Sequence, residues 1–520
     1  MSQNLSRSLR FTKEAVRSAH GVVAAQNQKA ADIGAAVLRT GGNAVDAAVA
    51  TAFALGALEP WMSGIGGCGY MMVWDAKKQA GHVVDFGAVS AAALDPADYP
   101  LAEGKGGDLF GWPAVLEDRN ILGYSSIAVP GQPEGMRLAL KTFGTRSWQH
   151  SLGPAIELAQ EGMEVDWYLS LMATSAAKDL NRSPASRAMF LPGGFPPAPD
   201  GGGAPVPRLK NAALLASLQR LAAAGARDYY EGDLAAKLVH DFAAGGSKIA
   251  AADLAGYRAR LSTPLRYTYG DKTLLLPPGL TAGPSLRDAL ETVAQKLDRA
   301  RPLGPASFVA YAEGLTEAYE KRLAGMGDTE NQGGCTTNLC VIDRDGNMVA
   351  LTQTLLSLFG SRVMLPESGV LMNNGIMWFD TRPGRPNSIG AAKRPLSNML
   401  PVLALDGDAP WLAIGASGGR RIMPAVMQLL SLLVDYRLSL EDAFHQPRID
   451  VSVPGQPTVD PLLDAAIRTA VAARFPQTIE HGRGPYPLTF ACPSAVLIGA
   501  DGARIGMTEI AQPWAGMAAA

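Results

Sequence analysis

The sequence has little of several features that mark common classes of protein. Its 520 residues include four cysteines, with no C-x-x-C pair and no histidine at metal-ligand spacing, so neither zinc nor a disulfide framework is indicated. Lys and Arg number 46 against 48 Asp and Glu, and the formal net charge of −2 argues against a nucleic-acid-binding protein.

Long apolar runs are also missing. No uncharged apolar stretch reaches the length of about 18 residues that a membrane span needs, so we predict no membrane partner. Residues 1–20 show no apolar core of a secretory signal, and we therefore expect a cytoplasmic protein. Hydrophobic residues make up 47% and charged residues 18%, a globular balance with ample material for a core.

The first part of the chain reads as mainly helical. Apolar spacing predicts a helix from Lys29 to the Gly41-Gly42 stop, and a second, almost wholly apolar helix over Asn43–Leu58 that should be buried. Strands are expected at Tyr70–Trp74 and His82–Phe86. Further helical patterns cover Asn211–Ala224, Leu234–Ala243 and Ser285–Leu297 on through Tyr319.

The second part is rich in strands. Asn338–Ile342 and Met348–Thr354 flank a turn that contains Asp-Gly, which predicts a hairpin. We also expect strands at Gly369–Met372, Met399–Leu405 and Trp411–Gly415, a buried helix over Met423–Tyr436, and a hairpin of Ala495–Ile498 with Arg504–Met507. Such an order suggests stacked layers of sheet and helix.

Two glycine-rich segments match known motifs. Gly64–Gly69 fits G-x-G-x-x-G, but a helix precedes it and a strand follows, the reverse of a dinucleotide site, so a tight packing turn is the better interpretation. Gly415–Gly419 fits G-x-S-x-G between a strand and a helix, so Ser417 could be a serine-hydrolase nucleophile with His445 or His481 as base. Glycine-rich turns also occur there for geometric reasons alone.

A third candidate precedes the predicted hairpin, at Cys335-Thr336-Thr337. A threonine hydroxyl becomes a useful nucleophile when its residue is an N-terminus, because the α-amino group then serves as base. That would require cleavage between Cys335 and Thr336. As a bare motif, two β-branched residues that begin a strand need no such explanation.

Several segments, in order, resemble the γ-glutamyltranspeptidase family. They span nearly the whole chain and include Gly41–Ala48, Glu59–Gly69, Thr336-Thr337, Val341–Asn347, Leu351–Thr354, Gly369–Asn374, Lys393–Ser397, and Gly415–Gly419 with Arg421-Ile422.

The resemblance implies an α+β fold, the four-layer αββα sandwich of N-terminal-nucleophile hydrolases. It implies autocatalytic maturation into a large subunit, residues 1–335, and a small subunit, residues 336–520, which together form one catalytic unit. Thr336 would be the nucleophile, Thr354 its supporting hydroxyl, and Gly418 and Gly419 the oxyanion donors. No metal or organic cofactor is implied.

The positions that bind the γ-glutamyl group in the family differ here. The arginine that binds the carboxylate is replaced by Gly87, and the aspartate that holds the ammonium, beyond Asn374, by Trp378. Leu356 stands where an amide or acid is usual, and Ser397 is kept beside Asn398. Charge-assisted hydrogen bonds contribute about 1.5–3 kcal/mol each, so we predict an amidohydrolase for another acyl group.

Two substrate classes stay open at this point. If Arg362 or Arg420 faces the pocket, a small carboxylate-bearing amide such as oxamate is favoured; if Trp378 and Leu356 dominate, an apolar acyl amide is. The short segment Ser388–Ala392 implies an open site, which weakly favours hydrolysis over acyl transfer.

The expected partners are the small-molecule amide and the two subunits of one precursor, with a homo-oligomer of that pair as a possibility. The alternatives are a true γ-glutamyltransferase or glutathione hydrolase, a serine hydrolase using Ser417, and an uncleaved binding protein without catalysis.

Overall fold

The computed structural model describes the chain except for residues 1–9, 107–111, 200–205, 327–334 and 487. Two seven-stranded sheets form its centre, and every strand pair within them is antiparallel. The first sheet runs in the order β21 (Gly516–Ala519), β2 (Gly21–Ala25), β12 (Cys335–Asp343), β13 (Met348–Leu356), β3 (Cys68–Asp75), β4 (Ala80–Phe86) and β9 (Arg260–Ser262).

The second sheet runs in the order β1 (Val16–Ser18), β20 (Arg504–Thr508), β19 (Cys492–Ile498), β15 (Ala409–Ser417), β14 (Val402–Asp406), β11 (Lys272–Leu276) and β10 (Leu265–Tyr269). It packs on the first sheet through β15 and β19, which lie against β12. Thr336, the predicted nucleophile, is the second residue of β12.

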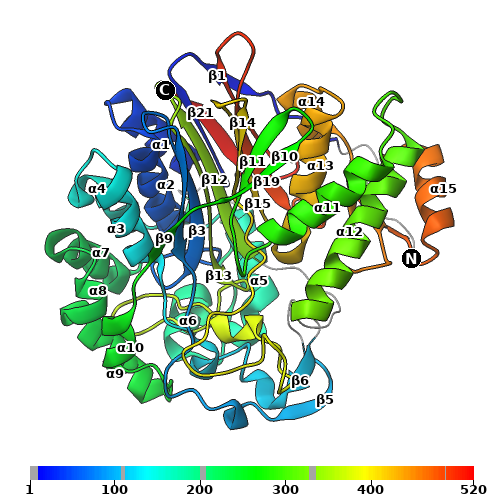
Figure 1. Cartoon of the computed structure of the whole chain (residues 1–520). Coiled ribbons are helices and arrows are strands. Elements are labelled where there is room, and N and C mark those ends of the chain that lie inside the picture. The colour runs from blue at the N-terminus through cyan, green and yellow to red at the C-terminus, as the bar shows by residue number, and fades with distance from the viewer. Residues whose placement is uncertain (1–9, 107–111, 200–205, 327–334, 487) are drawn as a thin grey trace.

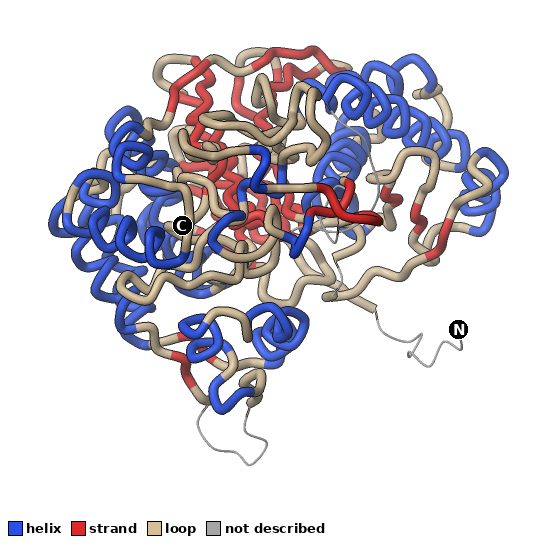
Figure 2. Tube along the Cα trace, turned by 90° about the horizontal axis from the view of Figure 1, so that it is seen from below, coloured by secondary structure: helices blue, strands red, loops and turns tan. Residues whose placement is uncertain are grey.

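Helices cover both outer faces, which gives four layers (Figure 1). The view from below shows the strands with helices on either side (Figure 2). The first sheet is covered by α1 (Gln28–Arg39), α2 (Ala44–Leu58) and α3 (Gln132–Phe143), with α4 (Trp148–Glu161) packed on α2. The second is covered by α11 (Gly283–Lys296) and α13 (Ile422–Val434), with α12 (Pro305–Met326) packed on α11. The predicted α+β sandwich is confirmed.

Shorter elements lie around these layers. The further helices are α5 (Trp167–Leu180), α6 (Pro184–Phe190), α7 (Ala212–Ala224), α8 (Asp228–Glu231), α9 (Asp233–Gly245), α10 (Ala251–Gly256), α14 (Leu440–His445) and α15 (Ala465–Arg474). The further strands are β5 (Leu101–Lys105), β6 (Pro113–Val115), β7 (Met163–Glu164), β8 (Arg208–Leu209), β16 (Ile449–Asp450), β17 (Thr458–Val459) and β18 (Ile479–Glu480).

The continuous apolar run in the sequence correctly predicted α2 as a buried helix. Asn43 caps it through bonds to the backbone N–H groups of Val45 and Asp46, and it is buried along nearly its whole length between the first sheet and the helices α1 and α4. A helix that is apolar on all sides needs such an environment.

One predicted strand is wrong. Residues 369–372 form only a single bridge, between Met364 and Leu371. The segment instead bonds to loops, since Met372 N donates to Val363 O at 2.9 Å and Asn373 N to Gly66 O at 3.2 Å. Tertiary packing has overridden a local strand preference.

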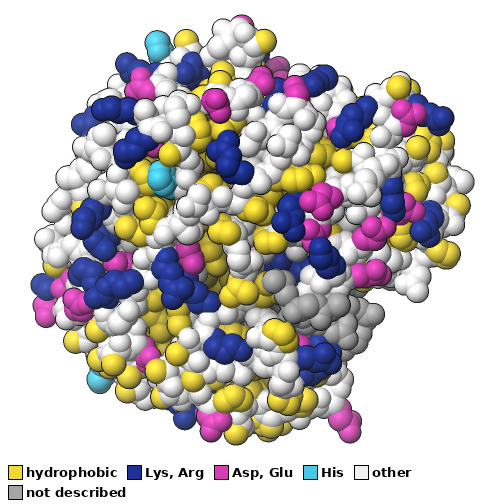
Figure 3. Space-filling model, in the orientation of Figure 1, with side chains coloured by type: hydrophobic (Ala, Val, Ile, Leu, Met, Phe, Trp, Pro, Cys, Tyr) yellow, Lys and Arg dark blue, Asp and Glu magenta, His cyan; other side chains and the backbone are white. Residues whose placement is uncertain are grey.

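The surface reflects the nearly equal numbers of basic and acidic residues in the sequence. Basic and acidic side chains are interspersed over the face that Figure 3 shows. In the part of the chain that the structure describes, no helix combines the length and apolar character of a membrane span.

Candidate active site

Thr336 lies at the start of β12, at an irregularity in the hairpin. Cys335 pairs with Leu356 and Thr337 with Gln353, so β13 holds one more residue than β12 over this stretch. A bulge of this kind bends a strand and re-aims a side chain, and bulges are over-represented next to active sites. Thr336 is 3% exposed, while the Cys335 side chain lies outside the described residues.

The bulge brings two threonine hydroxyls together. Thr336 Oγ1 lies 3.4 Å from Thr354 Oγ1, and the backbone N–H of Leu356 donates to Thr354 Oγ1 at 2.7 Å. Leu356 has φ 84°, a left-handed conformation that costs free energy in a residue with a branched side chain. The N–H of Leu356, in this strained stretch of backbone, thus fixes the hydroxyl that faces Thr336.

Gln26 connects this strand to the glycine turn. Its Oε1 accepts from Asn338 N at 3.3 Å, two residues beyond Thr336, and its Nε2 donates to Ser417 Oγ. Gly418 and Gly419 follow directly, with φ 133° and 61°, and lead into α13. Gln26 therefore holds the turn with the two candidate oxyanion donors close to the nucleophile strand.

The hydrogen bond between Gln26 and Ser417 bears on the alternative that the protein is a serine hydrolase. Ser417 is fully buried and its hydroxyl accepts from Gln26. His445 Nδ1 bonds to Glu441 O at 2.8 Å and His481 Nδ1 to Gly482 O at 2.8 Å. Among the described residues, no histidine makes a hydrogen bond to Ser417, so the geometry of a serine hydrolase is not present.

The residue that follows Thr354 across the first sheet is small. Cys68 is paired with Thr354 and Gly69 with Phe86, the last residue of β4, which Gly87 follows. Burial raises the pKa of the Cys68 thiol to about 12, so it is neutral at ordinary pH. Cys68, which is paired with Thr354, therefore adds no charge beside it.

An arginine that we did not predict lies beside Gly87. A Cβ placed on Gly87 would lie 3.2 Å from Arg394 Nη1 and 2.9 Å from Tyr70 Oη. Arg394 Nη1 donates to Asp85 Oδ1 at 2.6 Å. The family signature contained Arg394, but its position next to Gly87 depends on a contact across 309 residues of sequence, counted from Asp85.

Two predicted pocket residues support the surrounding loops. Asn374 Nδ2 donates to Ile121 O at 3.0 Å and to Ser357 Oγ at 2.6 Å. Trp378 is 4% exposed, and its carbonyl accepts from Asn387 Nδ2 at 2.7 Å. The side chains of Asn374 and Trp378 are both buried, and their contact with substrate stays a prediction.

Ser397 and Asn398 lie in a segment held by a buried arginine. Arg322 donates to Ser397 O at 2.6 Å and to Thr281 O at 2.9 Å. Burial lowers the pKa of Arg322 to about 10. Ser397 Oγ accepts from Met399 N at 3.2 Å, whereas Asn398 Nδ2 is buried without a hydrogen-bond partner among the described residues. For both residues, contact with substrate stays a prediction.

Comparison with known proteins identifies the family. A sequence profile of γ-glutamyltranspeptidase matches residues 30–333 and 329–486. The chain belongs to the γ-glutamyltranspeptidase family. It is 33% identical to the acylase ACY 1 proenzyme of Pseudomonas sp. (strain SE83), with 96% of this chain and 95% of that protein covered.

A glutathione hydrolase of the family is similar as well. The proenzyme of Bacillus subtilis (strain 168) is 30% identical, over 82% of this chain and 80% of its own length. The crystal structure of cephalosporin acylase from Bacillus halodurans superposes with a TM-score of 0.83 at 24% identity, covering 100% of this chain and 99% of the other, which establishes the shared fold. The chain is thus an amidohydrolase-type enzyme of the γ-glutamyltranspeptidase family.

Two arginines were predicted as anchors that could replace those of the γ-glutamyltranspeptidase family. Arg362 lines a cleft of about 480 Å³ together with residues of α5 and α6 and the loop between them, and its Nη1 donates to Gly360 O at 2.6 Å. Arg420 is 5% exposed, with its guanidinium 5.1 Å from the Tyr319 ring centre. The roles of both arginines in binding substrate stay predictions.

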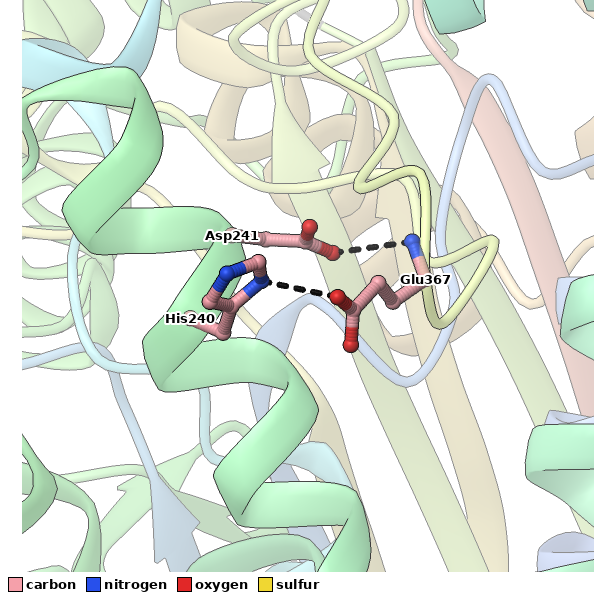
Figure 4. Close-up of side chains that lie close together, drawn as sticks. All are labelled: His240, Asp241 and Glu367. Carbon is pink, nitrogen blue, oxygen red and sulfur yellow. Dashed lines mark hydrogen bonds and ion pairs between the residues drawn. The ribbon is translucent and has the colours of Figure 1, made fainter.

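One group in the described part of the chain could hold a metal ion. His240 and Asp241 on α9 and Glu367 offer ligand atoms within 4.8 Å of one another (Figure 4). His240 Nδ1 and Glu367 Oε1 are paired at 2.7 Å, and Asp241 Oδ2 accepts from Glu367 N at 3.0 Å. The three groups satisfy one another without an ion, and none is bonded to the residues around Thr336.

Proposed function

We propose that this chain is a self-processing amidohydrolase that cuts itself between Cys335 and Thr336 and then cleaves amides through an acyl-enzyme on Thr336. The observation that carries the proposal is the buried pair of Thr336 and Thr354 hydroxyls, fixed by Leu356. Relatives described as proenzymes support maturation by cleavage. Residues 1–335 and 336–520 would be the large and small subunits.

Processing uses the same hydroxyl as turnover. Thr336 Oγ attacks the carbonyl carbon of Cys335, the C–N bond breaks, and the peptide is converted into an ester with a free Thr336 amine. Water then hydrolyses the ester and leaves a carboxylate at Cys335. Thr354, which faces Thr336 Oγ at 3.4 Å, orients the attacking oxygen in both reactions.

Turnover follows from the new N-terminus. Thr336 Oγ attacks the substrate carbonyl while its proton passes to the Thr336 amine, whose usual pKa of about 7.7–8.0 suits a base near neutral pH. The N–H groups of Gly418 and Gly419 stabilise the oxyanion, an interaction worth about 10²–10³ in rate per donor. The leaving amine takes the proton, and water releases the acid from the acyl-enzyme.

The acyl group is proposed to differ from γ-glutamyl. Gly87 and Trp378 cannot form the charged pairs expected at those positions, and a relative covering nearly the whole chain is an acylase. Glutathione hydrolases are also similar, so γ-glutamyl transfer or hydrolysis is the competing outcome of the test.

Intact mass under denaturing conditions tests the proposal. The wild type should give two fragments split between Cys335 and Thr336, and Thr336→Ala should give one full-length chain. A wild type that stays whole on prolonged incubation would exclude the mechanism and leave an uncleaved binding protein as the remaining alternative. Hydrolysis of γ-glutamyl-p-nitroanilide in preference to other acyl anilides would identify a true γ-glutamyl enzyme.

A further inference from the structure

Asn338 lies just past the end of the strand beside it. β12 is paired with β2 from Asp343 back to Leu339, whose partner Ala25 is the last residue of β2. The next backbone N–H toward Thr336, that of Asn338, donates to the side chain of Gln26 at 3.3 Å. Gln26 directly follows β2, so its side chain continues the hydrogen bonding of the sheet where the strand has ended.

The bond to Asn338 fixes which way round the amide of Gln26 lies. A backbone N–H can only donate, so the amide oxygen faces Asn338 and the NH2 group faces away. The NH2 group donates to Ser417 Oγ, and the amide is also hydrogen-bonded to Cys492, which is paired with Ser417 across β15 and β19. Gln26 is 1% exposed and Ser417 is fully buried, so bulk water does not compete for these bonds.

Gly418 and Gly419, which we call the oxyanion turn, need support from outside the turn. Their φ angles of 133° and 61° are values that glycine adopts without a steric cost. Two successive glycines have little stiffness of their own, so the direction of their N–H groups depends on the residues that flank them. Ser417 comes directly before them, and Gln26 ties it to the strand that begins with the nucleophile.

A second close contact brings the same two strands together. A Cβ on Gly415 would lie 2.3 Å from the side-chain amide of Asn338, so β15 approaches β12 more closely here than a side chain at position 415 would allow. The same amide is hydrogen-bonded to Ser494 Oγ on β19 at 2.8 Å. The two sheets therefore meet at Asn338, and Gln26 connects this meeting point to the oxyanion turn.

We infer that Gln26 is a positioning residue for the reaction: its side-chain amide sets the distance between the nucleophile strand and the oxyanion turn, as a neutral group that donates to Ser417. This inference rests on the proposed acyl-enzyme at Thr336. An ionised acid at position 26 would lose the donor and would place a negative charge beside the turn that must stabilise an oxyanion. The charge of the side chain therefore matters as well as its shape.

Gln26→Glu tests both parts of the inference in one protein. The protonated acid keeps an acceptor for Asn338 N and a donor for Ser417, and burial raises the pKa of such an acid. The rate of processing, divided by the wild-type rate at the same pH, should be close to one at about pH 5 and at least about tenfold lower at about pH 9. A ratio that does not change with pH would overturn the requirement for a neutral donor.

Other groups near position 26 also titrate. They are Cys492, which bonds to the amide, and the three charged residues that act on Cys492, namely Glu509, Lys13 and Glu59. All four are present in the wild type and in the variant, so dividing by the wild-type rate at each pH removes their contribution.

Gln26→Met removes both bonds and keeps the length of the side chain. We expect kcat for the acyl p-nitroanilide that the wild type hydrolyses fastest to fall about tenfold to hundredfold, with KM within about twofold, because the substrate contacts remain while the oxyanion donors are displaced. Wild-type kcat in Gln26→Met would overturn the inference.

Gln428→Met is the matched control. Gln428 is another buried glutamine, whose Nε2 donates to Ile449 O at 2.7 Å and whose Oε1 accepts from Ile449 N at 2.9 Å. Both methionine variants should lower the thermal midpoint, but Gln428→Met should leave kcat unchanged. An equal loss of kcat in the two variants would show a general effect of lost stability and would overturn the specific role of Gln26.

The outcomes separate this inference from the proposed function. A wild type that stays uncut would defeat the proposed function, whereas a wild type and a Gln26→Met that cut themselves equally fast would overturn the role of Gln26 alone. If neither Gln26 variant folds, Ser417→Ala tests the same bridge from its other end. It removes the acceptor of Gln26 Nε2 and should slow processing about tenfold, and wild-type processing in Ser417→Ala would overturn the inference.

Discussion

Replacing Thr354 by valine removes one hydroxyl from the centre of the site and keeps the shape of the side chain. In the wild type this oxygen accepts from Leu356 N at 2.7 Å and lies 3.4 Å from Thr336 Oγ1. Thr354→Val therefore has two effects that can be measured apart, one on stability and one on chemistry.

The stability effect comes from Leu356, whose N–H would be buried without its present acceptor. A buried N–H group without an acceptor lowers the free energy of unfolding by about 1–3 kcal/mol. The chemical effect comes from Thr336, whose hydroxyl would lose the partner that orients it. Misplacement of a reacting group by about 1 Å lowers rates by about a hundredfold, so we expect processing and turnover to slow by about that factor.

Thr352→Val is the matched control. Thr352 lies on the same strand and face, and its Oγ1 is hydrogen-bonded to the side-chain amide of Asn338 at 2.9 Å, also a buried contact. Both variants should lower the thermal midpoint to a similar extent, but only Thr354→Val should slow the appearance of the two fragments by mass spectrometry. Wild-type processing in Thr354→Val, or equal slowing in the control, would refute a specific role for this hydroxyl.

Two further predictions concern packing and pH. A Cβ at Gly67 would lie 2.4 Å from Thr354 O, so Gly67→Ala should destabilise the fold by about 1–3 kcal/mol in thermal unfolding and slow processing. Gly153→Ala, with open space around the new side chain, should do neither. A Gly67→Ala variant with wild-type stability and processing would contradict this prediction. Burial raises the pKa of Glu59 from 4.5 to about 8. The folded state therefore keeps a proton that the unfolded state loses above about pH 4.5. This contribution to the free energy of unfolding is complete below pH 4.5 and is lost as the pH rises toward 8. Glu59→Gln in uncut Thr336→Ala protein should flatten the fall in the unfolding midpoint between pH 5 and 8, and an unchanged slope would refute the assignment.

Local sequence patterns predicted the helices and strands better than they predicted which residues lie close together around Thr336. The hairpin of β12 and β13 and the helix α2 were found because their signals, an Asp-Gly turn and continuous apolar character, lie within the elements themselves. The strand expected at Gly369–Met372 failed because its backbone partners are loops brought there by the fold. The contact of Arg394 with Gly87 was missed for the same reason, since only tertiary structure brings the two residues together.

The strand order has a consequence for the matured protein. In the first sheet β2, from before residue 335, lies between β21 and β12, from after it; in the second sheet β1, β10 and β11 flank strands of the later part. Once the Cys335–Thr336 bond is cut, the two chains are interleaved in both sheets and cannot part without unravelling them. The covalent continuity that guided folding is then gone, so a denatured molecule has no simple route back. The lifetime of the mature enzyme would be governed by how fast it unfolds rather than by a folding equilibrium.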